Sequence, residues 1–219
     1  GRLSPDADPI HKATIIPRGP SLGVTSFLPE EDRHNLTKKW CLATIRVTMG
    51  GRAAEEIVFN EFTSGCANDL QQATRLAHSM VCEWGMSSLG PIAFGKNEEV
   101  FLGRDFVRMR EFSEETAAAV DREVHTILED AYRDTKALLE KHKDILDALA
   151  KALYDKETLE SDEIDEIISS IGGEHILPER WKKDKQKKFT EEEIKQPQES
   201  TEEIVKTLPP NQPPLPDLA

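Results

Sequence analysis

One carboxylate in the sequence shares an apolar helix face. Asp69, Ala73, Leu76 and Met80 follow one another at helical spacing, so their side chains lie in one stripe that otherwise faces a core. A buried carboxylate needs a partner, which can be a metal ion, an arginine or the free backbone N–H groups of the helix's first turn. An acid in a first turn is ordinary capping and dipole chemistry, so spacing favours the last option and does not establish a metal site.

A second pair of residues has metal-ligand chemistry. His78 and Cys82 are four residues apart on the same expected helix and could reach one ion, but two ligands are too few for a zinc site. The remaining histidines stand singly, and no HExxH string or Ser/His/Asp set can be assembled from neighbouring positions. These histidines are His11, His34, His125, His142 and His175.

Composition narrows the class of protein. The 219 residues are 37% hydrophobic and 32% charged, which is polar for a compact domain and predicts that part of the chain does not fold. A net charge of −13 disfavours binding to nucleic acid or anionic lipid. Cys41, Cys66 and Cys82 show no CxxC spacing, which fits a reducing compartment. No run of about 18 apolar residues occurs, so we expect this piece to be soluble, with any membrane attachment supplied from elsewhere.

The elements that must position these residues are mostly helical. Two β-rich segments, 11–16 and 22–28, flank a Pro/Gly turn and predict a hairpin. Apolar periodicity predicts helices that start after Pro29, at Arg52, at Ser113, near Ile145 and near Ile164. We expect Gly50 and Gly51 to end the first of these helices. The helix that carries Asp69 is expected to begin with Asn68 as its N-cap and to run to about residue 84.

The fold class predicted is therefore mainly α, with a small N-terminal β-hairpin and a disordered C-terminal tail. The domain boundary is placed at residue 172. Residues 1–172 form the folded domain, and residues 173–219 are rich in Lys, Glu, Gln and Pro and cannot bury enough surface to offset their chain entropy.

Nine short strings occur in an order that resembles a known family. Together they are similar to the C-terminal peptidase domain of FtsH-type ATP-dependent zinc metalloproteases (AAA proteases), and the resemblance covers about residues 1–171. The strings are DPIHK at 8–12, IIPRG at 15–19, LGVT at 22–25, LPEED at 28–32, GGRAAEE at 50–56, TSGCANDL at 63–70, GMS at 85–87, LGP at 89–91 and FLGR at 101–104.

The resemblance implies a helical zinc-peptidase domain that follows membrane segments and an AAA ATPase domain using ATP and Mg²⁺. It implies a homo-hexamer in the bacterial inner membrane, with the peptidase domain in the cytoplasm, or in an equivalent organelle membrane. The activity it implies is processive degradation of unfolded and membrane proteins. It also identifies Asp69 as the family's third zinc ligand, which replaces the capping interpretation.

The family's other two ligands and its general-base glutamate belong to an HEAGH string expected just ahead of Gly1. That string is absent here, so we expect this piece neither to retain zinc nor to cleave peptides. The resemblance also suggests that Leu22, Gly23, Val24 and Thr25 form an edge strand that pairs with an extended substrate. The alternative for that segment is an ordinary hairpin strand.

Two other functions are considered. In this truncated form the chain could be a noncatalytic module that holds a hexamer together, and mass in solution together with zinc content would distinguish this from a peptidase part. An unrelated helical adaptor with an acidic tail would require the ordered series of strings to be a coincidence.

Overall fold

The computed structural model describes residues 1–17, 19, 22–28, 35–94, 99–102, 105–108, 113–173 and 175–179. The chain divides into two units, Gly1–Lys182 and Lys183–Ala219, and all described residues belong to the first. The predicted tail, residues 173–219, therefore lies outside the described residues except for Gly173 and residues 175–179. Leu177, in the described part of that segment, is buried. The boundary at residue 172 stays a prediction.

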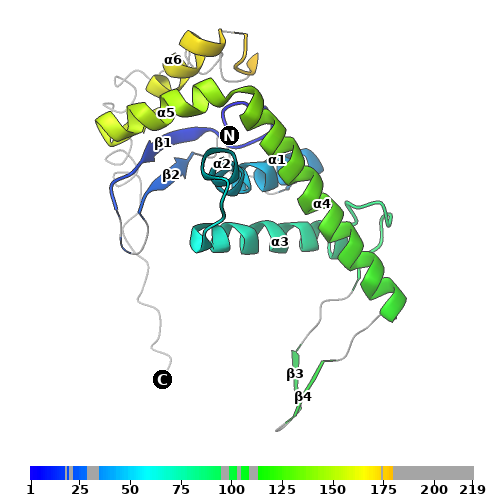
Figure 1. The fold of residues 1–219 in the computed structure, drawn as a ribbon. Helices are drawn as coiled ribbons and strands as arrows, with labels where there is room; N and C mark the ends of the chain where they lie inside the picture. Colours follow the sequence, from blue (N-terminus) through cyan, green and yellow to red (C-terminus); the bar gives the residue numbers. More distant parts are fainter. Residues whose placement is uncertain are drawn as a thin grey trace, which may run out of the picture. The chain divides into compact units, whose positions relative to one another are not determined.

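A small antiparallel sheet contains the predicted hairpin. Strands β1 (Ile10–Thr14) and β2 (Val24–Phe27) pair with each other, which confirms the hairpin (Figure 1). A third strand, β5 (Thr158–Glu160), pairs with the other edge of β1 and gives the order β2-β1-β5. The sequence did not predict β5, because three residues between two helices carry no readable period.

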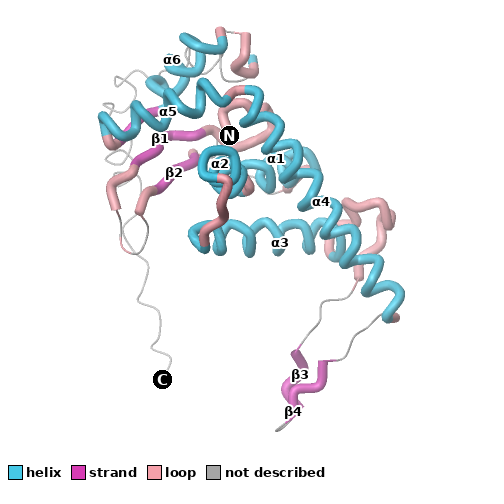
Figure 2. The backbone as a smooth tube through the Cα atoms, viewed as in Figure 1, coloured by secondary structure: helices cyan, strands magenta, loops and turns pink. Residues whose placement is uncertain are grey.

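The remaining elements are mainly helical, which confirms the predicted fold class (Figure 2). A further hairpin, β3–β4, joins the helical segments, in a region whose sequence gave little periodicity. These elements are α1 (Lys38–Thr48), α2 (Gly50–Phe59), the 3₁₀ turn η1 (Ser64–Cys66), α3 (Ala67–Cys82), β3 (Glu99–Leu102), β4 (Asp105–Arg108), α4 (Glu114–Lys141), α5 (Lys143–Lys156) and α6 (Ser161–Gly172).

The observed helix ends confirm one predicted cap and contradict two other predictions. Ser113 caps α4 as predicted, and its Oγ accepts the backbone N–H of Thr116 at 3.2 Å. Gly50 and Gly51, expected to end a helix, instead open α2 directly after α1. The prediction of Asn68 as an N-cap was also wrong: η1 precedes α3, so Asn68 is already the second residue of the helix.

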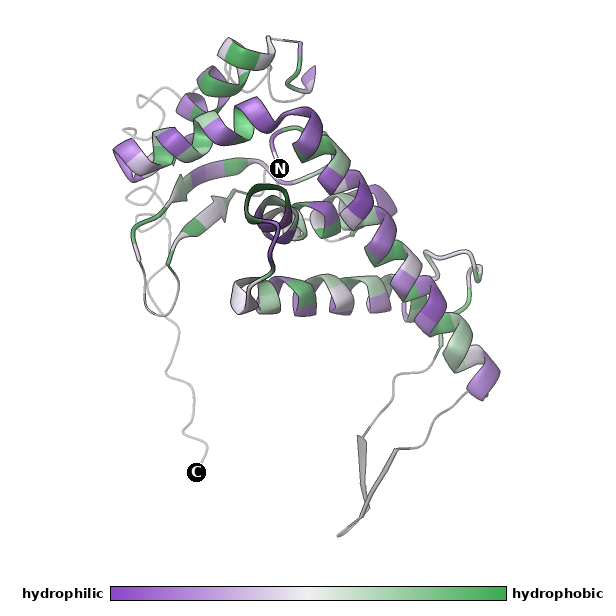
Figure 3. Ribbon diagram, in the orientation of Figure 1, coloured by the Kyte–Doolittle hydropathy of each residue, from purple (hydrophilic) through white to green (hydrophobic). Residues whose placement is uncertain are grey.

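Helices α1, α3 and α4 enclose the main core, and Figure 3 shows the apolar and polar residues alternating along each helix. Its buried members are Cys41 and Ile45 from α1, Met49 between α1 and α2, Ala73, Ala77 and Met80 from α3, and Ala131 from α4. A second core lies between the sheet, α5 and α6, and is formed by Ile145, Leu159, Ile164, Ile168 and Leu177. Within the described ranges, none of the helices combines the length and apolarity needed to cross a bilayer.

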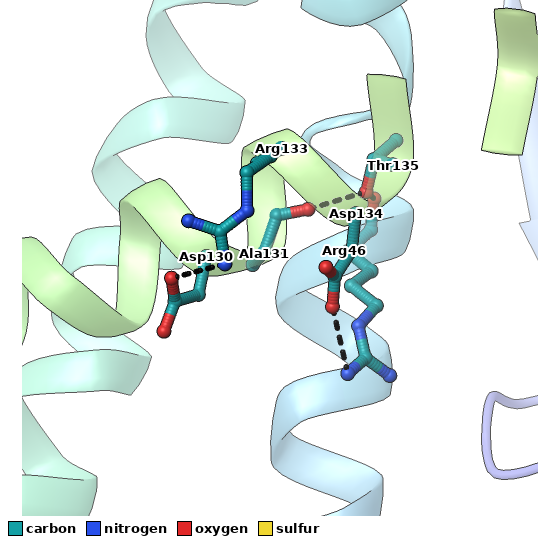
Figure 4. Close-up of polar contacts among 6 residues, drawn as sticks. All are labelled: Arg46, Asp130, Ala131, Arg133, Asp134 and Thr135. Carbon is teal, nitrogen blue, oxygen red and sulfur yellow. Dashed lines mark hydrogen bonds and ion pairs between the residues drawn. The ribbon is translucent and has the colours of Figure 1, made fainter. Parts of the chain in front are cut away.

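Polar contacts fix α4 against α1. The Thr135 hydroxyl lies within hydrogen-bond distance of two carbonyl oxygens, at 2.7 Å from Ala131 and 3.1 Å from Arg46 (Figure 4). Arg46 also pairs with Asp134 at 3.3 Å. A buried hydroxyl with a partner on the neighbouring helix sets the register of the two helices, so α4 is held in a fixed position against α1.

Candidate metal centre

Asp69 lies in the first turn of α3, where the helix emerges from the core. Ala73 and Met80 of the predicted stripe are buried and Leu76 is partly buried, while Asp69 itself is half-buried. Within the described part of the chain, the Asp69 carboxylate makes no hydrogen bond or ion pair, and Cys66 provides no side-chain cap. Neither an arginine nor a backbone N–H therefore satisfies Asp69 there, and the carboxylate remains available to an external cation.

The turn before α3 is held by α2. Glu55 accepts two hydrogen bonds from Thr63, one from the hydroxyl at 2.8 Å and one from the backbone N–H at 3.2 Å. Thr63 in turn caps η1, because its Oγ1 accepts the backbone N–H of Gly65 at 3.2 Å. Glu55 therefore holds the start of η1 in place. Because η1 leads directly into α3, it also sets the position of the first turn of α3, which carries Asp69.

Arg52 supports the same turn from another direction. Its guanidinium stacks on the Phe62 ring at 4.1 Å from the ring centre, and its Nη1 lies 3.8 Å from the Sγ of buried Cys66. The Cys66 thiol also lies 3.6 Å from the carbonyl oxygen of Thr63. These contacts close the turn into a compact structure around residues 62–66.

A polar cluster joins α2 to α4. Glu56 accepts a short hydrogen bond from the Tyr132 hydroxyl and pairs with Lys136 at 2.8 Å. The hydrogen bond from Lys136, reinforced by that from Tyr132, lowers the pKa of Glu56. Burial, together with the Glu56 hydrogen bond, raises the pKa of Tyr132 to about 12. The cluster fixes α2, so the segment that positions Asp69 rests on α4.

Comparison with known proteins assigns the family. Residues 1–167 match the model of Peptidase family M41. The chain belongs to this family.

Three relatives illustrate how the chain matches, and each aligns over most of this chain. It is 49% identical over 163 residues to "ATP-dependent zinc metalloprotease FtsH" of Acidobacterium capsulatum, covering 74% of this chain and 26% of that protein. It is 50% identical over 177 residues to "ATP-dependent zinc metalloprotease FtsH 4" of Sorangium cellulosum, covering 80% and 27%. It is 51% identical over 171 residues to "ATP-dependent zinc metalloprotease FtsH" of Kosmotoga olearia, covering 77% and 26%. The chain spans about a quarter of the length of the curated relatives it matches.

In this M41 chain, the described residues place no companion ligand beside Asp69. Among the described residues, no group of three His, Cys, Asp or Glu side chains is placed to hold a metal ion. The Cys82 Sγ lies 3.6 Å from the Nε2 of His78, but the described part of the chain supplies no third ligand to this pair. Burial raises the pKa of the Cys82 thiol, which is typical of a core cysteine. The role of Asp69 as a zinc ligand therefore stays a prediction.

The predicted substrate strand of the M41 domain lies at a sheet edge. Val24 and Thr25 belong to β2, and Leu22 and Gly23 lead into it. Leu22 is 83% exposed. Packing alone explains a glycine at position 23, since a Cβ there would lie 2.7 Å from the carbonyl oxygen of Thr14. A position at the sheet edge is compatible with pairing to a substrate strand, and that pairing stays a prediction.

Sequence reasoning missed Glu55, Glu56 and Tyr132. The string GGRAAEE contributed to the family resemblance, yet no role was assigned to its two glutamates. Thr63 and Tyr132 lie 8 and 76 residues from their glutamate partners, beyond the reach of helical spacing. An adjacent Glu-Glu pair in the middle of a short amphipathic helix was the only local signal.

Proposed function

We propose that this M41 chain is the peptidase part of a membrane-anchored, ATP-dependent zinc metalloendopeptidase that processively degrades unfolded and membrane proteins. Family membership supports the reaction class. The site is argued from the half-buried carboxylate of Asp69, to which the described residues give no hydrogen bond or ion pair. The proposal includes a homo-hexamer, an AAA ATPase domain using ATP and Mg²⁺, and a bacterial inner membrane or equivalent organelle membrane.

The residues present fit one part of a zinc site. Zinc in peptidases is held by nitrogen and oxygen donors, and an aspartate in a first helix turn supplies such an oxygen. When bound with an open position, the ion lowers the pKa of a water molecule for attack on a peptide carbonyl. Asp69 would hold the ion, while Glu55 and Thr63 would keep its helix in place. An HExxH string, which would supply the histidines and the base, does not occur in the 219 residues.

The test is zinc retention in a full-length protein that carries this chain. Asp69→Asn removes the charged donor and is expected to lower zinc affinity at least tenfold and to abolish cleavage of an unfolded protein. Asp162→Asn is the matched control, because Asp162 is an exposed aspartate in the first turn of α6. It is expected to keep both properties. Equal zinc content in the two variants would overturn the assignment of Asp69.

Leu22, Gly23, Val24 and Thr25 are proposed to pair with the substrate backbone. An edge strand accepts a peptide through main-chain hydrogen bonds and is therefore tolerant of sequence, which suits degradation of many proteins. Val24→Pro removes an N–H and is expected to reduce peptide cleavage by the full-length protein. Unchanged cleavage would leave β2 as an ordinary hairpin strand.

A second candidate is a noncatalytic hexamer-assembly module. The end of α2 and the segment after it expose three large apolar side chains, with Val58 45%, Phe59 73% and Phe62 49% exposed. Exposed apolar side chains in such a group are typical of surfaces that contact another protein. Phe59→Glu is expected to weaken self-association if this face joins subunits, and sedimentation of the 219-residue chain measures it.

A further inference from the structure

The last turn of α3 places a thiol beside an imidazole, away from the proposed zinc ligand. The Cys82 Sγ lies 3.6 Å from the Nε2 of His78, and Cys82 is the final residue of the helix. At a rise of ~1.5 Å per residue, His78 and Cys82 lie about 13 to 20 Å beyond Asp69 along the helix axis. The pair is therefore a separate cluster of metal-ligating atoms, and the proposed peptide hydrolysis does not use it.

One donor of this pair is held rigidly, and the other is open to solvent. Cys82 is 3% exposed and packs with Val81 and Val120. Its carbonyl oxygen accepts the backbone N–H of Phe94 at 2.8 Å, which fixes the end of the helix. His78 is exposed. An ion therefore reaches the thiol from the His78 side, where the imidazole is free to rotate toward it.

The distance between the two donor atoms fits one bridging ion. Bonds of ~2.3 Å to sulfur and ~2.0 Å to nitrogen leave the two donors about 4 Å apart across a nearly linear ion, and closer together across a bent one. The observed 3.6 Å lies within that reach, so a small rotation of the exposed imidazole allows either arrangement. Without an ion, the thiol and the ring nitrogen make a weak hydrogen bond.

The number and the softness of the donors select the ion. Among the described residues, no third His, Cys, Asp or Glu side chain joins the pair. Zinc takes four ligands in structural sites and is not satisfied by two. Thiolate is a soft ligand that selects Cu(I), and imidazole also suits copper. Cu(I) accepts a low coordination number, which this pair supplies.

The charge balance of the pair also favours a monovalent ion. On binding, the thiol releases its proton to solvent, an Sγ–Cu bond replaces the S–H bond, and copper stays in the Cu(I) state. A thiolate, a monovalent cation and a neutral imidazole carry no net charge together, so the buried side of the site tolerates the complex. The carboxylates of Glu83 and Asp121 act electrostatically on the Cys82 thiol. Their negative charge and the C-terminal end of α3 both attract a cation.

We propose that His78 and Cys82 form a binding site for a soft monovalent metal ion, Cu(I), held between the Cys82 Sγ and the His78 Nε2. The site goes beyond the proposed protease function and does not depend on Asp69. Because its two ligands are one helical turn apart, bound Cu(I) ties the last turn of α3 together. It should therefore raise the melting midpoint of the chain.

The test is an anaerobic titration of the reduced 219-residue chain against the Cu(I) complex of bicinchoninate, a chelator that loses its colour as the protein withdraws copper. The wild-type chain is expected to withdraw one equivalent. Cys82→Ser and His78→Phe each remove one of two donors and are expected to lower the Cu(I) affinity by about tenfold or more. A wild-type chain that leaves the copper with the chelator would overturn the proposal.

Two matched controls separate this pair from other thiols and histidines. Cys66 is a buried cysteine that contacts Arg52 and Thr63, and Cys66→Ser should keep the wild-type affinity. His125 is an exposed histidine of α4, and His125→Phe should keep it too. Far-UV circular dichroism establishes that each variant is folded. Wild-type affinity in His78→Phe, or an equal loss in Cys66→Ser, would show that Cu(I) binds elsewhere and that the assignment is wrong.

X-ray absorption at the copper K-edge of the loaded wild-type chain gives a readout that needs no variant. One sulfur and at least one nitrogen bonded to copper are expected, and copper bonded to sulfur alone would contradict the site. Asp69→Asn is expected to keep its Cu(I), so this site and the proposed zinc site fail or stand independently.

Discussion

Arg2 and Asp165 form a buried ion pair that joins the segment before β1 to α6. The Arg2 Nε donates to Asp165 Oδ1 at 2.7 Å, and Nη2 donates to Oδ2. Both side chains are almost fully buried, at 7% and 3% exposure. The two-point geometry satisfies both carboxylate oxygens, which is the condition for a buried pair to be tolerated.

Removing one partner of this pair is expected to be costly. Arg2→Met leaves the Asp165 charge buried without compensation and should lower the free energy of unfolding by about 3–5 kcal/mol. Urea denaturation followed by circular dichroism measures the change. Arg133→Met is the control, because the Arg133–Asp130 pair within α4 is exposed (Figure 4) and should contribute less than about 1 kcal/mol. Equal losses in both variants would show that burial does not decide the cost.

The cluster of Glu56, Tyr132 and Lys136 makes stability depend on pH. Hydrogen bonds from Lys136 and Tyr132 lower the pKa of Glu56 in the folded state. A lowered folded pKa means that the contribution is fully present above the unfolded pKa of about 4.3 and is lost as pH falls through the folded pKa. Glu56→Gln should therefore be less stable than wild type at neutral pH, and the difference should shrink in acid.

Urea titrations at neutral pH and at successively lower pH values measure that difference. The same comparison in a Lys136→Met background is the control, since Lys136 is the largest cause of the pKa shift. The pH dependence should then be reduced. A wild-type advantage that stays constant down to the acid range would rule out the ionised state of Glu56 as its source.

At the scale of the elements, the close approach of β2 to β1 depends on Gly23. A Cβ at this position would lie 2.7 Å from the carbonyl oxygen of Thr14, which is too close for any side chain. Gly23→Ala is therefore expected to displace β2, to destabilise the chain and to weaken peptide binding. Gly51→Ala is the opposite case, because a Cβ there meets nothing within 4 Å and the residue lies in α2.

Gly51→Ala should stabilise the chain by about 0.5–1 kcal/mol, since alanine has the higher helix propensity. Thermal melts of the two variants test both signs together. A stable Gly23→Ala variant with an unchanged hairpin would mean that β1 and β2 can separate without loss.

Periodicity predicted the elements better than it predicted their junctions. The hairpin and the helices near Ser113, Ile145 and Ile164 were found because their apolar spacing and caps agree. Gly50 and Gly51 misled, because packing of the α2 residues Ala53 and Glu56 outweighs the low propensity of two glycines.

The candidate site was less predictable than the fold. Spacing placed Asp69 on a core stripe, and only the family resemblance led from that observation to the prediction of a metal ligand. The contacts of Glu55 with Thr63, and of Glu56 with Tyr132, depend on how α2 packs, so no local pattern reveals them. Strand β5 likewise forms only because β1, about 145 residues earlier in the chain, provides its partner.

At the scale of the whole chain, the 219 residues by themselves are not expected to bind zinc. One aspartate cannot hold zinc, because a structural or catalytic site uses three or four protein donors. The chain is therefore expected to contain far less than one equivalent of zinc after purification. Added zinc should leave its melting midpoint unchanged, since a ligand that does not bind the native state cannot stabilise it.

Metal analysis and sedimentation of one sample together separate the two candidate functions. A zinc-free hexamer is the outcome that supports an assembly role for these residues, and a zinc-free monomer limits them to a peptidase part that needs other sequence. A protein in which an HExxH string is joined to these residues is the positive control and should gain stability from zinc. Stoichiometric zinc in the 219-residue chain would contradict the single-ligand argument and would direct attention to His78 and Cys82, whose side chains already lie 3.6 Å apart.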